Sequence, residues 1–377
     1  MRVLFVDDEP RVLEAIQRML SDAAGSWEVI TATSGPEALG MLEESRFDVI
    51  VTDIRMPGMD GATLLSKVHE RWPSMTRIVL SGHTDQADAM RAMGSAHQFL
   101  SKPCNPKKLT EVVENAFYLS ALTPNSRVRE LAAAVHRLPA MPKVHERILT
   151  LIDSSSASVR DAADLVSQDP GLCAKILRVV NSAFFARGQV VRDVRTATAR
   201  VGLDLLRALV LSERASCGLS GKRVEQIQRD ALDAAAVTMR IVSPDDQRTA
   251  FTAALLCDVG TLVLEQGAPD EIAAVRAHAA EGLLPLHVAE KELLGSSHAD
   301  VGGYVLGLWG VPPVIVDAVL GHHDLGRDPS ALSAAVHVAH SIVAGDVVTP
   351  EAAERAGVSS KLADIRQAYL EDKHAAA

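Results

Sequence analysis

Acidic residues follow two of the short apolar runs in the first part of the chain. Asp7 and Asp8 come directly after Val3–Val6, and Asp53 ends the run that begins at Val49. Two carboxylates about 4 Å apart repel each other by roughly 4 kcal/mol at the effective dielectric of a protein surface. A cation relieves that repulsion, and Mg²⁺ suits the position because it takes oxygen ligands and keeps several waters. We therefore expect these carboxylates to hold Mg²⁺ if the fold brings them together.

A hydroxyl and an amine follow two further strand candidates. Ser81 follows Arg77–Leu80. Lys102 follows Gln98–Leu100. Beside a metal ion, Asp53 is positioned as a nucleophile that forms an acyl phosphate, with Lys102 as a point charge and Ser81 as a hydroxyl donor to the phosphoryl oxygens. The predicted chemistry is phosphoryl transfer to the carboxylate of Asp53.

The elements that must position these residues alternate between strands and amphipathic helices. Five strand candidates are separated by helical stretches: Val3–Val6, Glu28–Thr31, Val49–Thr52, Arg77–Leu80 and Gln98–Leu100. This alternation predicts an α/β fold, a doubly wound five-stranded parallel sheet covered on both faces. The carboxyl ends of the strands form the ligand crevice in such a sheet. Residues that are distant in the sequence should therefore converge at that edge.

Residues 1–119 resemble the receiver domain of bacterial response regulators, which has the strand order 2-1-3-4-5. The motifs that carry the resemblance are the pair Asp7-Asp8, the run VTDIRMPGMDG around Asp53, Ser81 and the pair Lys102-Pro103. The resemblance implies that Mg²⁺ is held by Asp8, Asp53 and the backbone carbonyl of Arg55, with Asp7 acting mostly through water. It also implies that a sensor histidine kinase supplies the phosphoryl group.

The same resemblance implies a conformational switch. The Lys102-Pro103 peptide is expected to be cis, which only an X-Pro bond adopts at low cost. Phe99 occupies the place where the family keeps an aromatic switch residue. We expect Ser81 to move toward the phosphoryl group and Phe99 to fill the vacated space, a coupling of about 1–3 kcal/mol.

The strand pattern disappears after about Ser120, and only helix signatures follow. Residues 120–130 are expected to be a linker, 131–345 an all-helical output domain, and 346–377 a C-terminal helical extension and tail. The output domain is similar to the HDOD family, a helical signalling domain related to the HD phosphohydrolases. The segments that carry this resemblance are LPAMP at Leu138–Pro142 and LVSQDPGLCAKILRVVNSAFF at Leu165–Phe185.

The metal ligands of the HD hydrolases are mostly replaced here. Cys257-Asp258 stands in place of the His-Asp pair, the helix expected at about 224–242 contains no histidine, and His340 stands in place of the distal Asp. We therefore expect Cys257, Asp258 and His340 to form a degenerate site that binds no metal, in a domain that is not an enzyme. Adjacent helical residues point about 100° apart, so His322-His323 is interpreted as a polar cluster at a helix end.

The net charge and the lengths of the apolar runs argue against some classes of function. The formal net charge is -10, which argues against nucleic acid as the main partner. No run is long and apolar enough to span a bilayer, so a cytoplasmic protein without a membrane partner is expected. Its expected partners are the sensor kinase, a downstream signalling protein and a second copy in a homodimer. Two alternatives stay open: a metal-dependent (cyclic di)nucleotide phosphohydrolase regulated by the receiver, and a DNA-binding regulator.

Overall fold

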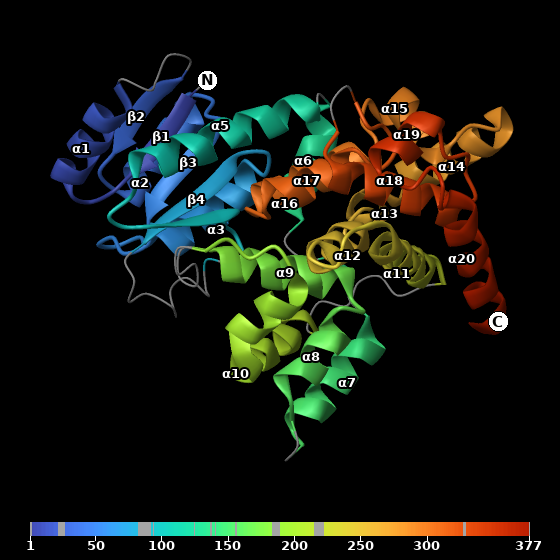
Figure 1. Cartoon of the computed structure of the whole chain (residues 1–377). Helices are drawn as coiled ribbons and strands as arrows, with labels where there is room; N and C mark the ends of the chain where they lie inside the picture. The colour runs from blue at the N-terminus through green and yellow to red at the C-terminus, as the bar shows by residue number, and fades with distance from the viewer. Residues whose placement is uncertain are drawn as a thin grey trace. The chain divides into compact units, whose positions relative to one another are not determined.

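The chain divides into two compact units, which are described separately (Figure 1). The computed structural model describes residues 2–21, 27–81, 92, 94–123, 125–135, 138–139, 141–154, 157–182, 189–214, 222–326 and 329–376. The first unit contains the sheet and the helices up to residue 135. The second unit contains most of the residues that follow.

The first unit is built on a five-stranded parallel sheet in the order β2-β1-β3-β4-β5. Its strands are β1 (Arg2–Val6), β2 (Glu28–Ala32), β3 (Val49–Asp53), β4 (Thr76–Ser81) and β5 (Gln98–Ser101). The predicted fold class and strand order are confirmed. In register, Asp53 lies beside Leu80 of β4, and Ser81 lies beside Ser101 of β5.

Helices cover both faces of the sheet because its strands are apolar on both sides. The helices of this unit are α1 (Pro10–Ser21), α2 (Gly35–Glu44), α3 (Gly61–Arg71), α5 (Pro106–Leu122) and α6 (Ser126–Ala134). Leu4 and Val6 of β1 face the core that α2 and α3 complete. Val3 and Phe5 face the opposite core, which α1 and α5 complete. This alternation is the period of two that a strand imposes on its side chains.

A buried arginine attaches α6 to the sheet. The Arg77 side chain is fully buried near the start of β4 and donates to the carbonyl oxygens of Met75 (2.8 Å), Ser95 (2.6 Å) and Ala133 (3.0 Å). The His97 Nε2 also lies 3.2 Å from the Ala133 oxygen. The first compact unit therefore includes α6, and α5 runs to Leu122, so both helices extend into the predicted linker at residues 120–130.

The second unit is helical throughout its described residues, as the sequence predicts. Its helices are α7 (Pro142–Ile152), α8 (Val159–Val166), α9 (Pro170–Asn181), α10 (Val194–Arg214), α11 (Lys222–Ile241), α12 (Gln247–Leu255), α13 (Val259–Gly267), α14 (Pro269–Gly282), α15 (Leu286–Leu294), α16 (His298–Leu308), α17 (Pro313–Leu320), α18 (Ala331–Ala344), α19 (Pro350–Arg355) and α20 (Leu362–Ala376). The C-terminal helices α19 and α20 complete a core with Val237 of α11 and Ile342 of α18.

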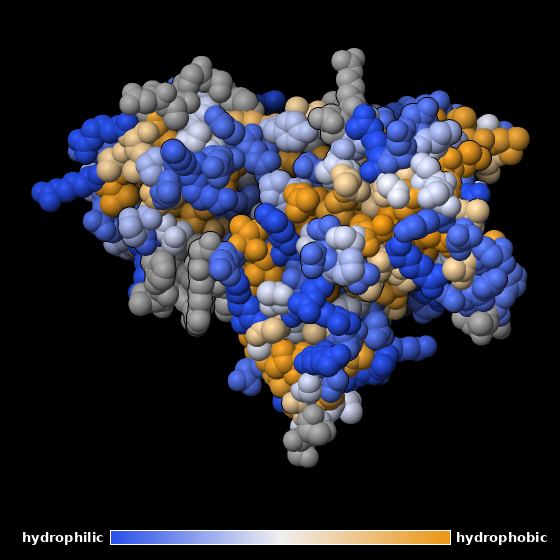
Figure 2. Space-filling model, viewed as in Figure 1, coloured by the Kyte–Doolittle hydropathy of each residue, from blue (hydrophilic) through white to orange (hydrophobic). Residues whose placement is uncertain are grey.

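One described stretch, Gln247–Gly267, is long and apolar enough to cross a bilayer by length and composition alone. It consists of α12 and α13, which residues 256–258 separate, and 72% of its most apolar window is buried inside the protein. Burial of this kind is what a core helix pair shows. Hydrophilic and hydrophobic residues both reach the viewed surface (Figure 2). Leu283, directly after α14, is 92% exposed.

Candidate functional site

Three carboxylates meet at the carboxyl edge of the sheet, where the sequence places them. Ligand oxygens of Asp7, Asp8 and Asp53 all lie within 4.8 Å of one another. Asp7 is buried, because it follows β1 beneath the edge, while Asp8 and Asp53 are half-buried. Asp7 is held by the amide of Glu9, which donates to its Oδ1 at 3.0 Å. An all-oxygen donor set of this kind suits Mg²⁺.

Lys102 bridges two of the carboxylates. Its Nζ lies 2.7 Å from Asp7 Oδ2 and 3.0 Å from Asp53 Oδ2. Burial lowers the pKa of Lys102, but its hydrogen bonds to Asp7 and Asp53 outweigh that effect and leave the pKa above its usual value. The lysine therefore carries a fixed positive charge beside the oxygen that the predicted chemistry uses.

The carboxylate of Asp53 is oriented from both sides. Its Oδ1 accepts a hydrogen bond from the amide of Ile54 at 2.8 Å, which leaves Oδ2 toward Lys102. Burial raises the pKa of Asp53, and the hydrogen bond from Lys102 opposes that rise. The cluster of three carboxylates includes one lysine, which contacts two of them, so the cluster retains negative charge that a divalent cation can neutralise.

The loop that follows Asp53 returns to pack directly against it. The amide of Gly61, at the start of α3, donates to the carbonyl of Ile54 at 2.9 Å. A Cβ at Gly61 would lie 2.0 Å from the backbone oxygen of Asp53. Glycine is therefore required at this position, because any side chain would push away the strand end that carries Asp53.

The other predicted receiver residues are placed as follows. Lys102-Pro103 is a cis peptide, as the resemblance implies. Phe99 is 5% exposed in β5 and packs in the core beneath α3, and its switching role stays a prediction. Arg55 is exposed two residues beyond Asp53, and its carbonyl ligand role likewise stays a prediction. Ser81 ends β4, and its side chain lies outside the described residues.

A second cluster of ionisable groups lies inside the helical unit. Asp258 precedes α13, and its carboxylate makes no capping hydrogen bond to that helix. It faces histidines instead: Oδ1 lies 3.5 Å from His298 Nε2 and 3.8 Å from His322 Nε2, and Oδ2 lies 3.5 Å from His340 Nε2. Burial raises the pKa of Asp258, but these histidines outweigh it and hold the pKa far below its usual range.

The predicted grouping of Cys257, Asp258 and His340 is found, since their ligand atoms lie within 4.8 Å of one another. Whether this group binds metal stays a prediction. Burial and the neighbouring carboxylate raise the pKa of the Cys257 thiol well above its usual value.

Sequence reasoning missed that other histidines join the cluster. The Nε2 atoms of His298 and His323 are 2.9 Å apart, and those of His298 and His322 are 3.2 Å apart. His322 and His323 do lie in a polar cluster at a helix end, but the helical geometry assumed for them does not apply, because α17 ends at Leu320 and both residues lie beyond it. Gly321, directly before the pair, is the sequence signal for that helix end.

A pocket of about 500 Å³ opens onto this cluster. Its lining includes Asp258, His298, His323 and His340 from the cluster. Leu283 and Leu284, after α14, form another part of the wall. Leu283 has φ 50°, a left-handed conformation that costs a branched residue on the order of 1–3 kcal/mol.

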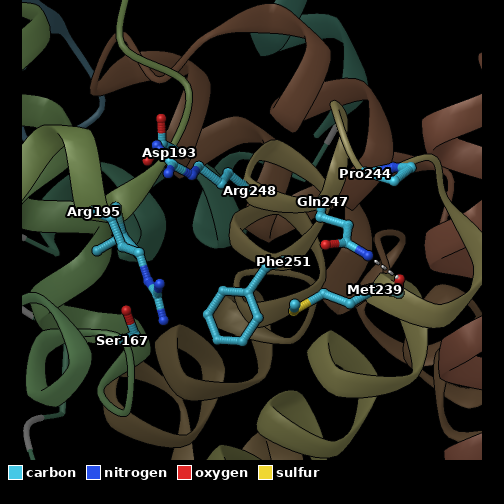
Figure 3. Close-up of a pocket in the computed structure, with 9 residues that line it drawn as sticks. Ser167, Asp193, Arg195, Met239, Pro244, Gln247, Arg248 and Phe251 are labelled. Carbon is cyan, nitrogen blue, oxygen red and sulfur yellow. Dashed lines mark hydrogen bonds between the residues drawn. The ribbon is translucent and has the colours of Figure 1, made fainter.

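A smaller pocket of about 340 Å³ lies between α10 and α12 (Figure 3). Figure 3 shows Phe251 in its middle, with Arg195 and Arg248 on one side. Several of its polar groups are already bonded within the unit: Arg195 pairs with Asp164 at 2.8 Å, and Gln247 Nε2 donates to the Met239 carbonyl at 3.0 Å. The convergence of ionisable groups is stronger at the histidine cluster.

Comparison with known proteins agrees with this division. Residues 3–114 match the family model of the response regulator receiver domain, and residues 138–325 match that of the HDOD domain. The crystal structure of the MmoQ response regulator from Methylococcus capsulatus is 25% identical, with a TM-score of 0.50 over 61% of this chain and 98% of that one.

Curated relatives match between 30% and 58% of this chain. The hydrogenase transcriptional regulatory protein HoxA of Cupriavidus necator is 40% identical over 30% of this chain and 23% of its own length. The positive alginate biosynthesis regulatory protein of Pseudomonas aeruginosa is 28% identical over 58% of this chain and 97% of its own length. The chain spans only 23% to 34% of the first matched relatives. With the geometry above, these matches establish that the chain belongs to the response regulators that join an N-terminal receiver domain to a C-terminal HDOD domain.

Proposed function

We propose that this protein is a cytoplasmic two-component response regulator whose receiver is phosphorylated on Asp53 by a sensor histidine kinase. The observation that carries the proposal is the contact of Lys102 Nζ with both Asp7 and Asp53 at 2.7 Å and 3.0 Å. A fixed positive charge beside a half-buried carboxylate favours the approach of a phosphoryl group, because catalysis of phosphoryl transfer depends mainly on positioning and charge stabilisation.

The same residues fit the cofactor that this chemistry needs. Asp8, Asp53 and the carbonyl of Arg55 would hold Mg²⁺, with Asp7 acting through water. Three carboxylates with one lysine leave an excess of negative charge, which matches a divalent ion. Bound Mg²⁺ would neutralise charge on the incoming phosphoryl group. In the transfer, Asp53 Oδ2 would form the new bond to phosphorus while the bond from phosphorus to the donor breaks, and the leaving group stays with the donor.

We propose further that the HDOD domain is not an enzyme and acts through protein–protein interactions. The described residues of α11, 222–241, include no histidine, and Cys257 is a buried thiol where the hydrolases use histidine. The phosphohydrolase alternative therefore lacks ligands on which a hydrolytic metal pair depends. Phosphorylation of Asp53 would instead change how the domain binds a downstream signalling protein or a second copy of this chain.

The DNA-binding alternative has little support in the helix that suggested it. Arg195 and Arg207 of α10 pair with Asp164 and Asp153, and Arg200 donates to the Gln189 carbonyl at 3.0 Å. These arginines are engaged inside the unit rather than offered together to a phosphate backbone.

The phosphorylation proposal is tested with a small acyl-phosphate donor, Mg²⁺ and the full-length protein. Asp53→Asn should abolish labelling, and chelation of Mg²⁺ should abolish labelling of the wild type. Asp60→Asn is the matched control, because Asp60 lies in the same loop, caps α3 through the amide of Thr63, and asparagine caps equally well. Equal labelling of Asp53→Asn and the wild type would remove Asp53 as the acceptor.

The output proposal is tested by affinity capture with phosphorylated and unphosphorylated protein, with Asp53→Asn as the reference. Light scattering of the two forms measures whether the homodimer population changes. Identical captured proteins and identical masses in both forms would contradict phosphorylation-dependent binding. Turnover of cyclic dinucleotides that Asp258→Ala abolishes would establish the enzyme alternative instead.

A further inference from the structure

Three imidazole rings in the HDOD domain present the same ring nitrogen to one small volume. The His298 Nε2 lies 3.2 Å from that of His322 and 2.9 Å from that of His323. His298 and His322 are 3% and 0% exposed, so bulk water cannot separate their ring nitrogens. The short separation of these Nε2 atoms must therefore be explained by a proton or an ion that lies between them.

The protons of two rings are assigned by their other nitrogens. His322 Nδ1 lies 2.6 Å from the carbonyl oxygen of Val319, which only accepts, so Nδ1 carries the proton and donates. His298 Nδ1 lies 2.6 Å from the buried carboxylate of Glu290 and donates to it in the same way. When both rings are neutral, each has a lone pair on Nε2, and these lone pairs face each other at 3.2 Å.

Facing lone pairs repel unless a cation lies between them. A single added proton would bridge only two nitrogens, whereas three converge here. Two nitrogens bound tetrahedrally at about 2.05 Å from a Zn²⁺ ion lie about 3.3 Å apart, close to the observed separations. The carboxylate Oδ1 of Asp258, 3.5 Å from His298 Nε2 and 3.8 Å from His322 Nε2, completes a four-ligand set.

We propose that the HDOD domain binds one divalent transition-metal ion of the Zn²⁺ type through His298, His322, His323 and Asp258. This set differs from the Cys257–Asp258–His340 group, and it uses the borderline ligands that Zn²⁺ prefers. Glu290 and the Val319 carbonyl fix two of the rings from behind, an arrangement that is typical of histidines that bind metals.

His340 has a different part in this site. Its Nε2 lies 3.5 Å from Oδ2 of Asp258, the oxygen that faces away from the other histidines. It orients the carboxylate rather than binding the ion. The ligands come from the turn before α13, the first residue of α16 and the segment after α17, so the ion joins three parts of the fold. The adjoining pocket of about 500 Å³ gives the ion and chelators access.

The test uses full-length protein that has been stripped with a chelator, dialysed and titrated with Zn²⁺ or Co²⁺. The wild type should bind one equivalent, and Co²⁺ should give the strong visible absorption of a four-coordinate site. His323→Gln, a half-buried position, should weaken binding at least tenfold, and Glu290→Gln should weaken it by about 10- to 100-fold. His278→Gln is the control, because the His278 side chain is 40% exposed and pairs with Glu292 outside the cluster.

Asp53→Asn should bind metal like the wild type, so failure of this proposal is distinguishable from failure of the phosphorylation proposal. Circular dichroism of each variant establishes that it is folded. The proposal is overturned if the folded wild type binds less than half an equivalent at millimolar Zn²⁺. It is equally overturned if His323→Gln and Glu290→Gln bind metal as tightly as His278→Gln does.

Discussion

Among the described glycines of the receiver, Gly61 leaves the least room for a side chain. The change to examine is Gly61→Ala, which adds one methyl group beside the strand end that carries Asp53. The new Cβ would lie 2.0 Å from the Asp53 carbonyl oxygen and 3.0 Å from the Cα of Ile54, and both contacts are with backbone atoms. No flexible side chain can move aside to relieve them.

The size of the effect follows from these distances. An ordinary contact begins near 3.4 Å, so the methyl group and the Asp53 carbonyl must separate by about 1.4 Å. Overpacking of this kind typically costs about 1–3 kcal/mol of unfolding free energy. A displacement of about 1 Å at a reacting group can reduce a rate by about 10²-fold. We therefore expect both lower stability and slower phosphorylation of Asp53.

The assay compares initial rates of labelling by a small acyl-phosphate donor with Mg²⁺, together with urea unfolding. Gly40→Ala is the matched control, because Gly40 lies inside α2 and a Cβ there would meet nothing within 4 Å. That substitution should leave the labelling rate unchanged and raise stability by about 0.5–1 kcal/mol.

Two results would refute the reasoning about Gly61. If Gly61→Ala matches the wild type in stability and rate, the close approach to Asp53 does not exist in solution. If stability falls while the labelling rate is unchanged, the loop supports the fold but does not position Asp53.

Three further predictions concern other contacts. Glu37→Gln should lower stability by about 0.5 kcal/mol at pH 7 after allowance for exposure, because hydrogen bonds from the Thr33 hydroxyl and amide lower the pKa of Glu37. That stabilisation is present above the unfolded-state pKa and is lost as pH falls through the lowered one, so urea unfolding should show the difference shrinking below about pH 4. Arg77→Met should lower the free energy of unfolding by about 2 kcal/mol or more and speed amide hydrogen exchange in α6, because it leaves buried carbonyl groups without their donor. Unchanged exchange in α6 would contradict its attachment by Arg77. Gly260→Ala, whose Cβ would lie 1.9 Å from the His298 carbonyl oxygen, should lower the melting temperature and weaken Co²⁺ binding, and wild-type values for both would contradict the close packing of α13 on α16.

The receiver site could be predicted because its geometry follows from strand order alone. Once five strands run parallel, Asp7, Asp53 and Lys102 must meet at one edge, whatever the details of the helices. Strand bounds agree within about one residue because β3 and β4 are buried and each contains a run of three β-branched or leucine residues, Val49–Val51 and Ile78–Leu80.

The histidine cluster could not be predicted in the same way. Its members come from three segments whose mutual placement depends on helix packing, which sequence periodicity does not specify. His322 and His323 were judged by helical geometry, although their backbone has left the helix after Leu320. The attachment of α6 to the first unit could not be predicted for a related reason. In sequence Arg77 resembles an ordinary surface charge, and only the packed structure shows it binding the end of α6.

The contact of Arg77 with α6 has a consequence for how a change near Asp53 could reach α6. Arg77 lies near the beginning of β4, and Ser81 lies four residues later at its other end. At about 3.3 Å per residue, the two positions are about 13 Å apart along a single extended segment. The carboxyl edge of the sheet, where Ser81 ends β4, and the contact of Arg77 with α6 are thus at opposite ends of the same strand.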